Sequence, residues 1–85
     1  MTPKSHITPG SFVIVTNAGN GVNGPVTLTE EGNFLSGHIC PQIGDILEIT
    51  NKPKKVDGIN LVKVQYRDRI LDAYYCHIRF STKPI

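Results

Sequence analysis

The glycine-rich segment 17–24, Asn-Ala-Gly-Asn-Gly-Val-Asn-Gly, most constrains the fold because it directly follows an apolar run at residues 12–15. It matches the G-x-G-x-x-G pattern with which dinucleotide-binding domains hold a pyrophosphate at the start of a helix. No helix is expected here, since Pro25 is followed by residues 26–29, which alternate apolar and β-branched polar side chains as strands do. Two Asn-Gly pairs tolerate positive φ and favour a wide hairpin loop. The segment therefore predicts a turn between two strands rather than a cofactor site.

Length and composition predict one small domain built from β-strands. Eighty-five residues suffice for one hydrophobic core. Hydrophobic residues make up 39% of the chain, Trp is absent and Phe and Tyr are few, so Val, Ile and Leu must form most of that core, which suits a sheet. Eight Gly and six Pro divide the chain into segments too short for a long helix. We expect a single all-β domain over residues 1–85, with residues 1–8 as a flexible N-terminus.

Alternating side chains and turn residues predict five strands whose spacing suits a small barrel or a sandwich, and we expect the five-stranded barrel. The strands are expected at residues 12–16, 26–29 with an extension through Phe34 and Leu35, 46–50, 61–66 and 74–80. A basic turn at residues 51–60 joins the third strand to the fourth. A charged connection at residues 67–73 precedes the fifth strand, and a short helical turn is expected within it.

A resemblance to a known family supports the barrel. Segment 10–29 is similar to a KOW motif, in which a strand, a glycine-containing loop and a second strand follow one another. The matching residues are Gly10, Val13, Val15, Gly24 and Val26. Ser11 stands where the motif usually has an acidic residue, and the family's basic loop residues are missing. The resemblance implies an SH3-like (KOW-like) barrel that binds RNA, DNA, the ribosome or RNA polymerase.

The last two predicted strands suggest a binding surface. Successive side chains of a strand point to opposite faces. One face should enter the core with Val62, Val64, Tyr66, Tyr74, Cys76, Ile78 and Phe80. The opposite face would carry Lys63, Gln65, Arg67, Tyr75, His77 and Arg79. Such a surface can neutralise phosphates and stack a base, but the same alternation is also typical of a strand that only faces water.

The charge is concentrated in the second half of the chain. Residues 1–44 carry one Lys against two Glu, whereas residues 45–85 carry eight Lys or Arg against five Asp or Glu. Lys52, Lys54 and Lys55 lie in the basic turn and would attract polyanions independently of their sequence. An alternative explanation is that these lysines prevent nearby strand ends from pairing with other chains.

Neither a metal site nor a catalytic site is expected. His38, Cys40, Cys76 and His77 are residue types that bind zinc, but neighbours on a strand face opposite sides and the spacing of a zinc knuckle is absent. Both cysteines are therefore predicted to be reduced core thiols.

No recognised motif links a nucleophile to a base, which argues against an enzyme. Asp45, beside Gly44, and Asp57, before Gly58, are interpreted as turn formers.

These features predict a small basic non-catalytic accessory protein, cytoplasmic and without a membrane segment or small-molecule cofactor. Its expected partner is DNA, RNA or a nucleic-acid machine such as RNA polymerase or the ribosome. Lys63, Arg67 and Arg79 would contact phosphates, Tyr75 and His77 would stack or hydrogen-bond, and Lys52, Lys54 and Lys55 would steer the partner. The alternative is a protein-binding module, of the free-standing kind that phages encode, which modulates a host or partner enzyme.

Overall fold

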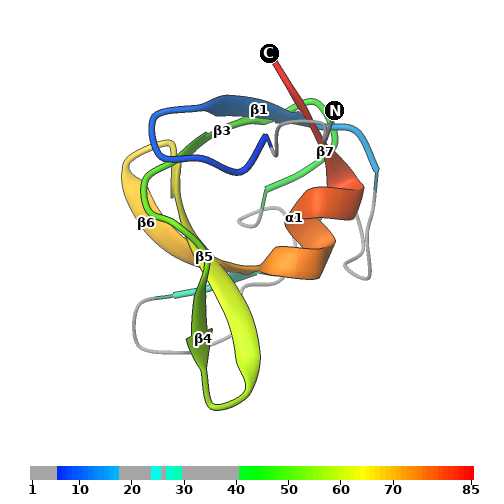
Figure 1. The fold of residues 1–85 in the computed structure, drawn as a ribbon. Helices are drawn as coiled ribbons and strands as arrows, with labels where there is room; N and C mark the ends of the chain where they lie inside the picture. Colours follow the sequence, from blue (N-terminus) through cyan, green and yellow to red (C-terminus); the bar gives the residue numbers. More distant parts are fainter. Residues whose placement is uncertain (1–5, 18–23, 26, 30–40) are drawn as a thin grey trace, which may run out of the picture.

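Antiparallel strands are the main regular structure in the part of the chain that the computed structural model describes, namely residues 6–17, 24–25, 27–29 and 41–85. These residues form seven strands and one short helix (Figure 1). In chain order the elements are β1 (Phe12–Val15), β2 (Thr27–Leu28), β3 (Ile46–Ile49), β4 (Lys54–Val56), β5 (Ile59–Tyr66), β6 (Arg69–Tyr74), α1 (Tyr75–Ser81) and β7 (Thr82–Pro84). The predicted all-β class is confirmed at this level, with α1 as an addition.

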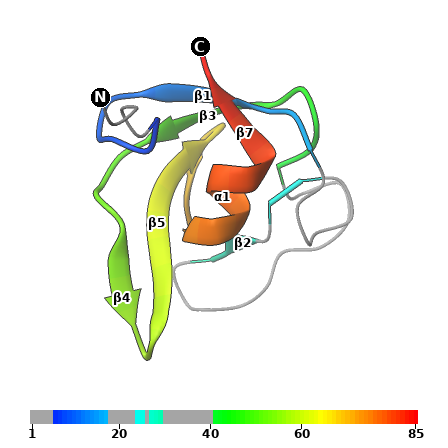
Figure 2. The same ribbon diagram turned by 45° about the vertical axis from the view of Figure 1, so that its right-hand side comes forward.

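The strands pair in the order β2-β6-β5-β3-β1-β7, and β4 pairs with β5 beside this path. Every ladder is antiparallel. Among the described residues no ladder joins β2 to β7, so the sheet is not closed into a barrel. The predicted five-stranded barrel is therefore wrong. The sheet instead curves around α1, which lies against β5, β6 and β7 (Figure 2).

The predicted hairpin between the first two strands is also wrong. Strand β1 pairs with β3 and β7, whereas β2 pairs with β6, where Thr27 lies opposite Ala73. Thr27 is buried against β6, so long-range packing, rather than the local loop, places this strand. The predicted turn at residues 18–23 and the extension through Phe34 and Leu35 lie outside the described residues.

The core follows the side-chain alternation of the strands. Val62, Val64 and Tyr66 of β5 are buried, which confirms their predicted direction. The other buried hydrophobic side chains are Ile7, Val13, Val15, Leu47, Ile49, Leu71, Ala73 and Ile78. Part of the N-terminal segment that was expected to be flexible thus contributes Ile7 to the core, and His6 Nε2 lies 3.0 Å from Thr82 Oγ1.

The predicted fifth strand at residues 74–80 is wrong, because Tyr75–Ser81 forms α1. The short helical turn expected within residues 67–72 is wrong as well, since β6 begins at Arg69 and pairs with β5 along its length. Once β6 occupies the place beside β5, the chain has to cross to the far edge of the sheet. Helix α1 makes that crossing and brings β7 to β1.

The helix changes which side chains are buried. Ile78 is fully buried and Ser81, three residues later, is buried on the same side, as helical spacing requires. Phe80 is 72% exposed, and Cys76 is an exposed free thiol, so the predictions that both lie in the core are wrong. Cys40 lies outside the described residues.

Two aspartates shape turns as predicted. Asp57 and Gly58 have φ values of 51° and 81°, the pair of positive angles that a two-residue type I′ turn requires, and they join β4 to β5. The Asp45 carboxylate accepts hydrogen bonds at Oδ2 from the Gln42 backbone N–H at 2.9 Å and from the Tyr66 hydroxyl at 2.6 Å. Asp45 therefore connects the turn before β3 to the end of β5.

Replacement of Ile78 and of Phe80 by alanine distinguishes the helix from the predicted strand. Ile78→Ala should lower the free energy of unfolding by about 2–5 kcal/mol, because it empties a fully buried site. Phe80→Ala should change it by no more than about 0.5 kcal/mol, since the ring is mostly in water. Urea denaturation measures both values. A large loss for Phe80→Ala would contradict the helix.

Replacement of Tyr66 by phenylalanine tests the bond to Asp45. The variant should lose about 1.5–3 kcal/mol of unfolding free energy, because a hydroxyl that donates to a carboxylate is removed from a buried ring. Tyr75→Phe is the matched control, since the Tyr75 hydroxyl makes no hydrogen bond within the described part of the chain. Equal losses in thermal or urea denaturation would show that the bond to Asp45 contributes nothing specific.

Candidate nucleic-acid interface

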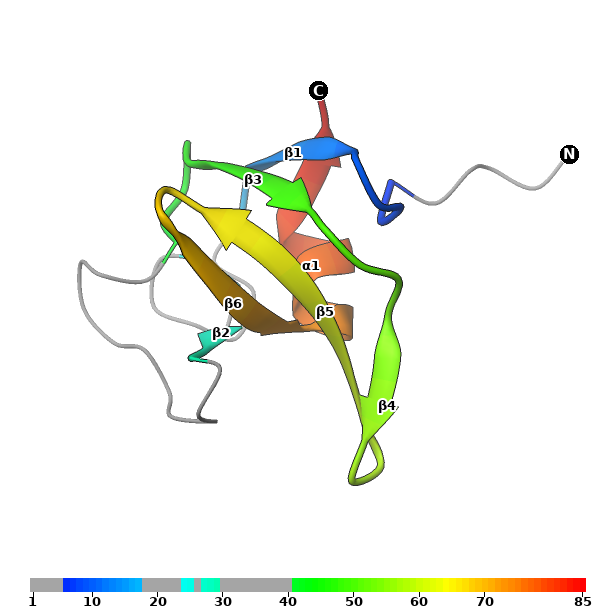
Figure 3. The same cartoon turned by 90° about the vertical axis from the view of Figure 1, so that its left-hand side faces the viewer.

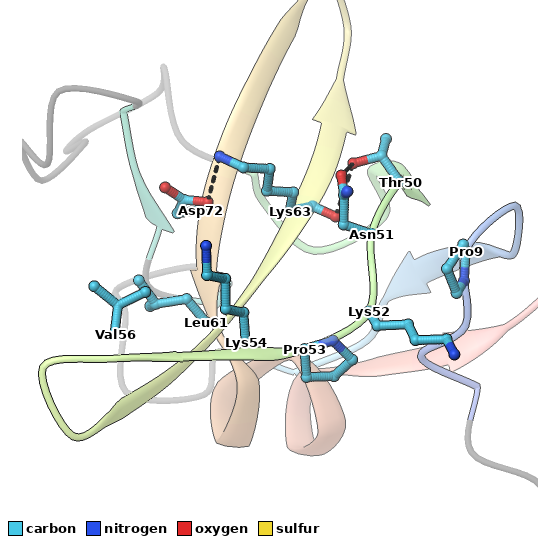
Figure 4. Close-up of a pocket in the computed structure, with 10 residues that line it drawn as sticks. All are labelled: Pro9, Thr50, Asn51, Lys52, Pro53, Lys54, Val56, Leu61, Lys63 and Asp72. Carbon is cyan, nitrogen blue, oxygen red and sulfur yellow. Dashed lines mark hydrogen bonds and ion pairs between the residues drawn. The ribbon is translucent and has the colours of Figure 1, made fainter.

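A hollow of about 630 Å³ opens between the β4–β5 hairpin and β6 (Figure 4). We call it the lysine hollow. Its described lining residues are Pro9, Thr50, Asn51, Lys52, Pro53, Lys54, Val56, Leu61, Lys63 and Asp72. They come from the segment before β1, the turn after β3, and strands β4, β5 and β6, so the hollow exists only once these elements have assembled.

Three of the predicted binding residues, Lys52, Lys54 and Lys63, line this hollow. The Lys63 ammonium lies 3.1 Å from Asp72 Oδ1, across the β5–β6 ladder in which the two residues face each other. Figure 4 shows the Lys54 side chain pointing toward this ion pair and the Lys52 side chain pointing away from it, on the side of Pro9. Asp72 is the one carboxylate among the described lining residues, which leaves an excess of positive charge.

The lysine hollow also has an apolar side. Lys54 and Val56 lie on the same face of β4, because alternate residues of a strand share a face. Opposite them, Leu61 pairs with Lys54 across the hairpin. Together with Pro53, Val56 and Leu61 give the hollow an apolar wall beside its ammonium groups. Such a site can accept an anionic group that carries an apolar or aromatic neighbour.

The turn after β3 holds one side of the hollow in place. The Thr50 backbone N–H donates to the Lys63 carbonyl at 3.0 Å, and the Thr50 hydroxyl donates to Asn51 Oδ1 at 2.9 Å. Because the first bond joins this turn to β5 at Lys63 itself, the positions of Lys52 and Lys63 are coupled through the backbone.

The remaining predicted binding residues lie elsewhere. Lys55 occupies the face of β4 opposite to Lys54 and does not line the hollow. Arg67 lies in the β5–β6 turn, with φ at 57° and its guanidinium 5.2 Å from the centre of the Tyr66 ring. These two cations therefore do not form part of the hollow.

Tyr75, His77 and Arg79 lie on α1. The Arg79 guanidinium lies 5.7 Å from the centre of the Tyr75 ring, and the His77 ring lies 5.3 Å from that of Tyr74. The predicted continuous face of β5 and a strand at residues 74–80 is therefore wrong. In the structure Lys63 pairs with Asp72 of β6, and Gln65 pairs with Ile70 of β6 and with Glu48 of β3. The binding role of each residue stays a prediction.

Asp72 and Pro53 were not anticipated as parts of the site. A signal for Asp72 was present: the apolar residues Leu71 and Ala73 alternate with the more polar Asp72 and Tyr74. This pattern favours a strand, and antiparallel pairing with β5 would have set Asp72 opposite Lys63.

The described residues contain no cluster of three or more His, Cys, Asp or Glu that could hold a metal ion. His38 and Cys40 lie outside this part of the chain. Within the described ranges, no helix has the length and apolar character needed to cross a membrane.

Comparison of the chain with protein-family models, with curated proteins and with solved structures finds no match. The resemblance to a KOW motif stays a prediction.

A double-mutant cycle on Lys63 and Asp72 tests how much their ion pair contributes to stability. Their side chains are 43% and 20% exposed, so solvent screens the pair and we expect a coupling energy of about 0.2–1 kcal/mol. Urea denaturation of Lys63→Gln, Asp72→Asn and the double variant measures it, and high salt should reduce it. A coupling above about 2 kcal/mol would mean that the pair is a structural element rather than a readily separated pair.

Proposed function

We propose that this protein is a small non-catalytic accessory protein that contacts nucleic acid, or a machine built on nucleic acid such as RNA polymerase or the ribosome. The observation that carries the proposal is that Lys54 is directed toward Lys63 in a hollow that Lys52 also lines and whose described lining includes one carboxylate, Asp72 (Figure 4). Lysine side chains that gather at a concave site neutralise phosphates and release their counterions, which is the main source of affinity for nucleic acids.

The shape of the hairpin supports the same proposal. Residues 51–60 are all exposed, and the β4–β5 hairpin extends beyond the body of the sheet (Figure 3). Lys54 and Lys55 point to opposite faces of this hairpin, so both faces carry a positive charge. A partner can thus approach the hairpin from either side without displacing core residues.

The resemblance of segment 10–29 to a KOW motif supports this class of partner. Gly10 has a φ of 87°, which favours glycine, and Val13 and Val15 are buried in β1, as the motif's first strand would require. The order β6-β5-β3-β1-β7, with a short helix before the last strand, supports a relation to SH3-like domains.

A second candidate, a protein-binding module that modulates a partner enzyme, is favoured by a different surface. Phe12 and Ile46 are 51% and 54% exposed on β1 and β3, and with Ile85 they line an apolar groove beside Pro84. Exposed clusters of large apolar side chains commonly mark protein interfaces. This groove is separate from the lysine hollow, with which it shares no described lining residue.

Charge reversal in the hollow tests the leading proposal. In fluorescence anisotropy at about 50 mM salt, the protein should bind single-stranded DNA, duplex DNA or RNA, and binding should weaken as salt rises. The double variant Lys52→Glu, Lys54→Glu should bind at least about tenfold more weakly and show a smaller salt slope, since it removes phosphate contacts.

Lys83→Glu combined with Arg69→Glu is the matched control, because it changes the net charge equally at exposed positions that neither line the hollow nor belong to the predicted binding residues. Equal losses in both double variants would show that net charge alone governs binding. Absence of binding to all three nucleic acids would rule out direct contact. A pull-down from lysate with and without nuclease then separates partners held by nucleic acid from partners that bind the protein itself.

A further inference from the structure

We propose that the lysine hollow binds one phosphate-bearing unit of a single-stranded nucleic acid, with the phosphate at Lys54 and Lys63 and the base or sugar against Pro53, Val56 and Leu61. This inference rests on the proposed function and specifies its ligand. It also assigns a role to Asp72 as a counterion of Lys63. Asp72 weakens binding because it competes with the phosphate of the ligand for the Lys63 ammonium.

The phosphate position follows from the two lysines that point to the same place. In Figure 4 the Lys54 side chain is directed toward the Lys63–Asp72 ion pair. Each ammonium has three N–H donors, and Lys63 uses one of them on Asp72 Oδ1 at 3.1 Å. An entering phosphate can therefore accept hydrogen bonds from both ammonium groups.

The apolar wall indicates that the ligand is more than a free anion. Val56 is 42% exposed although it belongs to a strand, and it lines the same hollow as Leu61 and the Pro53 ring. An inorganic ion would leave these surfaces in water. A nucleotide unit covers them with its sugar or the face of its base, and this contact is tolerant of sequence because every base has an apolar face.

The size of the hollow favours a single strand. A volume of about 630 Å³ is in the range of pockets that hold one small organic molecule, so the hollow has room for one nucleotide. In a duplex the faces of the bases are stacked inside, and only the base edges, the sugars and the phosphates reach a protein without base extrusion. A single strand can turn a base toward the apolar wall while its phosphate stays beside Lys54 and Lys63.

Removal of the Asp72 charge should raise the affinity for the ligand, whereas removal of a lysine charge should lower it. Asp72 is the one described carboxylate that lines the hollow, and it lies opposite Lys63 in the β5–β6 ladder. Asp72→Asn keeps an oxygen that can accept from the Lys63 ammonium and removes the negative charge. Affinity for a phosphate should then rise, because the repulsion disappears and Lys63 is no longer neutralised.

The experiment titrates the full chain into a labelled single-stranded oligonucleotide of about 10 nucleotides at low salt, with anisotropy as the readout. Lys54→Gln and Lys63→Gln should each weaken binding about fivefold, whereas Asp72→Asn should strengthen it by a similar factor. Val56→Ser should weaken binding without changing the salt slope, since it removes apolar contact and no charge.

Each variant has a matched control. Lys83→Gln removes the same charge from an exposed position on β7, and Asp68→Asn removes the same charge as Asp72→Asn from the β5–β6 turn. Both should change the affinity by no more than about twofold, because solvent screens exposed charges outside the hollow. Circular dichroism verifies that every variant is folded.

Four outcomes overturn the inference in distinguishable ways. Binding that survives Lys54→Gln and Lys63→Gln, or that falls equally in Lys83→Gln, leaves the proposed function standing and rejects the hollow as the binding site. Tighter binding of duplex than of single strand rejects the single-stranded ligand. Competition by inorganic phosphate or a mononucleotide at the concentration of the oligonucleotide identifies a small phosphate ligand instead. Absence of oligonucleotide binding by the unsubstituted protein rejects direct contact and the inference together.

Discussion

The pairing of β5 with three other strands is the constraint on which the rest of the structure depends. Its first residues pair with β4, Val64 and Gln65 pair with β3, and residues 61–66 pair with β6. The buried side chains of the same strand, Val62, Val64 and Tyr66, lie at the centre of the core. Because three ladders share this strand, its register also sets the positions of the side chains on its outward face.

The candidate site is a direct consequence of that register. The alternation that buries Val62 and Val64 places Lys63 on the outer face, and the β6 ladder places Asp72 beside it. The type I′ turn at Asp57 and Gly58 folds β4 back along β5, which brings Lys54 to the same side. Packing of the core and assembly of the lysine hollow are therefore two results of the same strand pairing. The apolar groove at Phe12 and Ile46 arises independently, on the outer face of β1 and β3.

Strands with a clear alternation could be predicted from the sequence, and the segment at residues 74–80 could not. Residues 12–16, 46–50 and 61–66 were expected as strands, and the structure has β1, β3 and β5 there. The segment at 74–80 also alternates and contains residues that favour strands, yet the spacing of Ile78 and Ser81 fits a helix equally well. Seven residues are too few for periodicity to distinguish a strand from a helix. The segment forms a helix because β6 already takes the place beside β5.

The sequence by itself determined the β-rich class, the inward direction of Val62, Val64 and Tyr66, and the turn at Asp57. These are local properties, since the two-residue period of a strand and the positive φ of a turn depend only on neighbouring residues. Only the tertiary structure decided that Lys63 forms an ion pair with Asp72 and lines a hollow with Lys54, rather than lying beside His77 and Arg79. Strand partners are chosen by the burial of residues that lie far apart in the chain, and no local pattern contains that information.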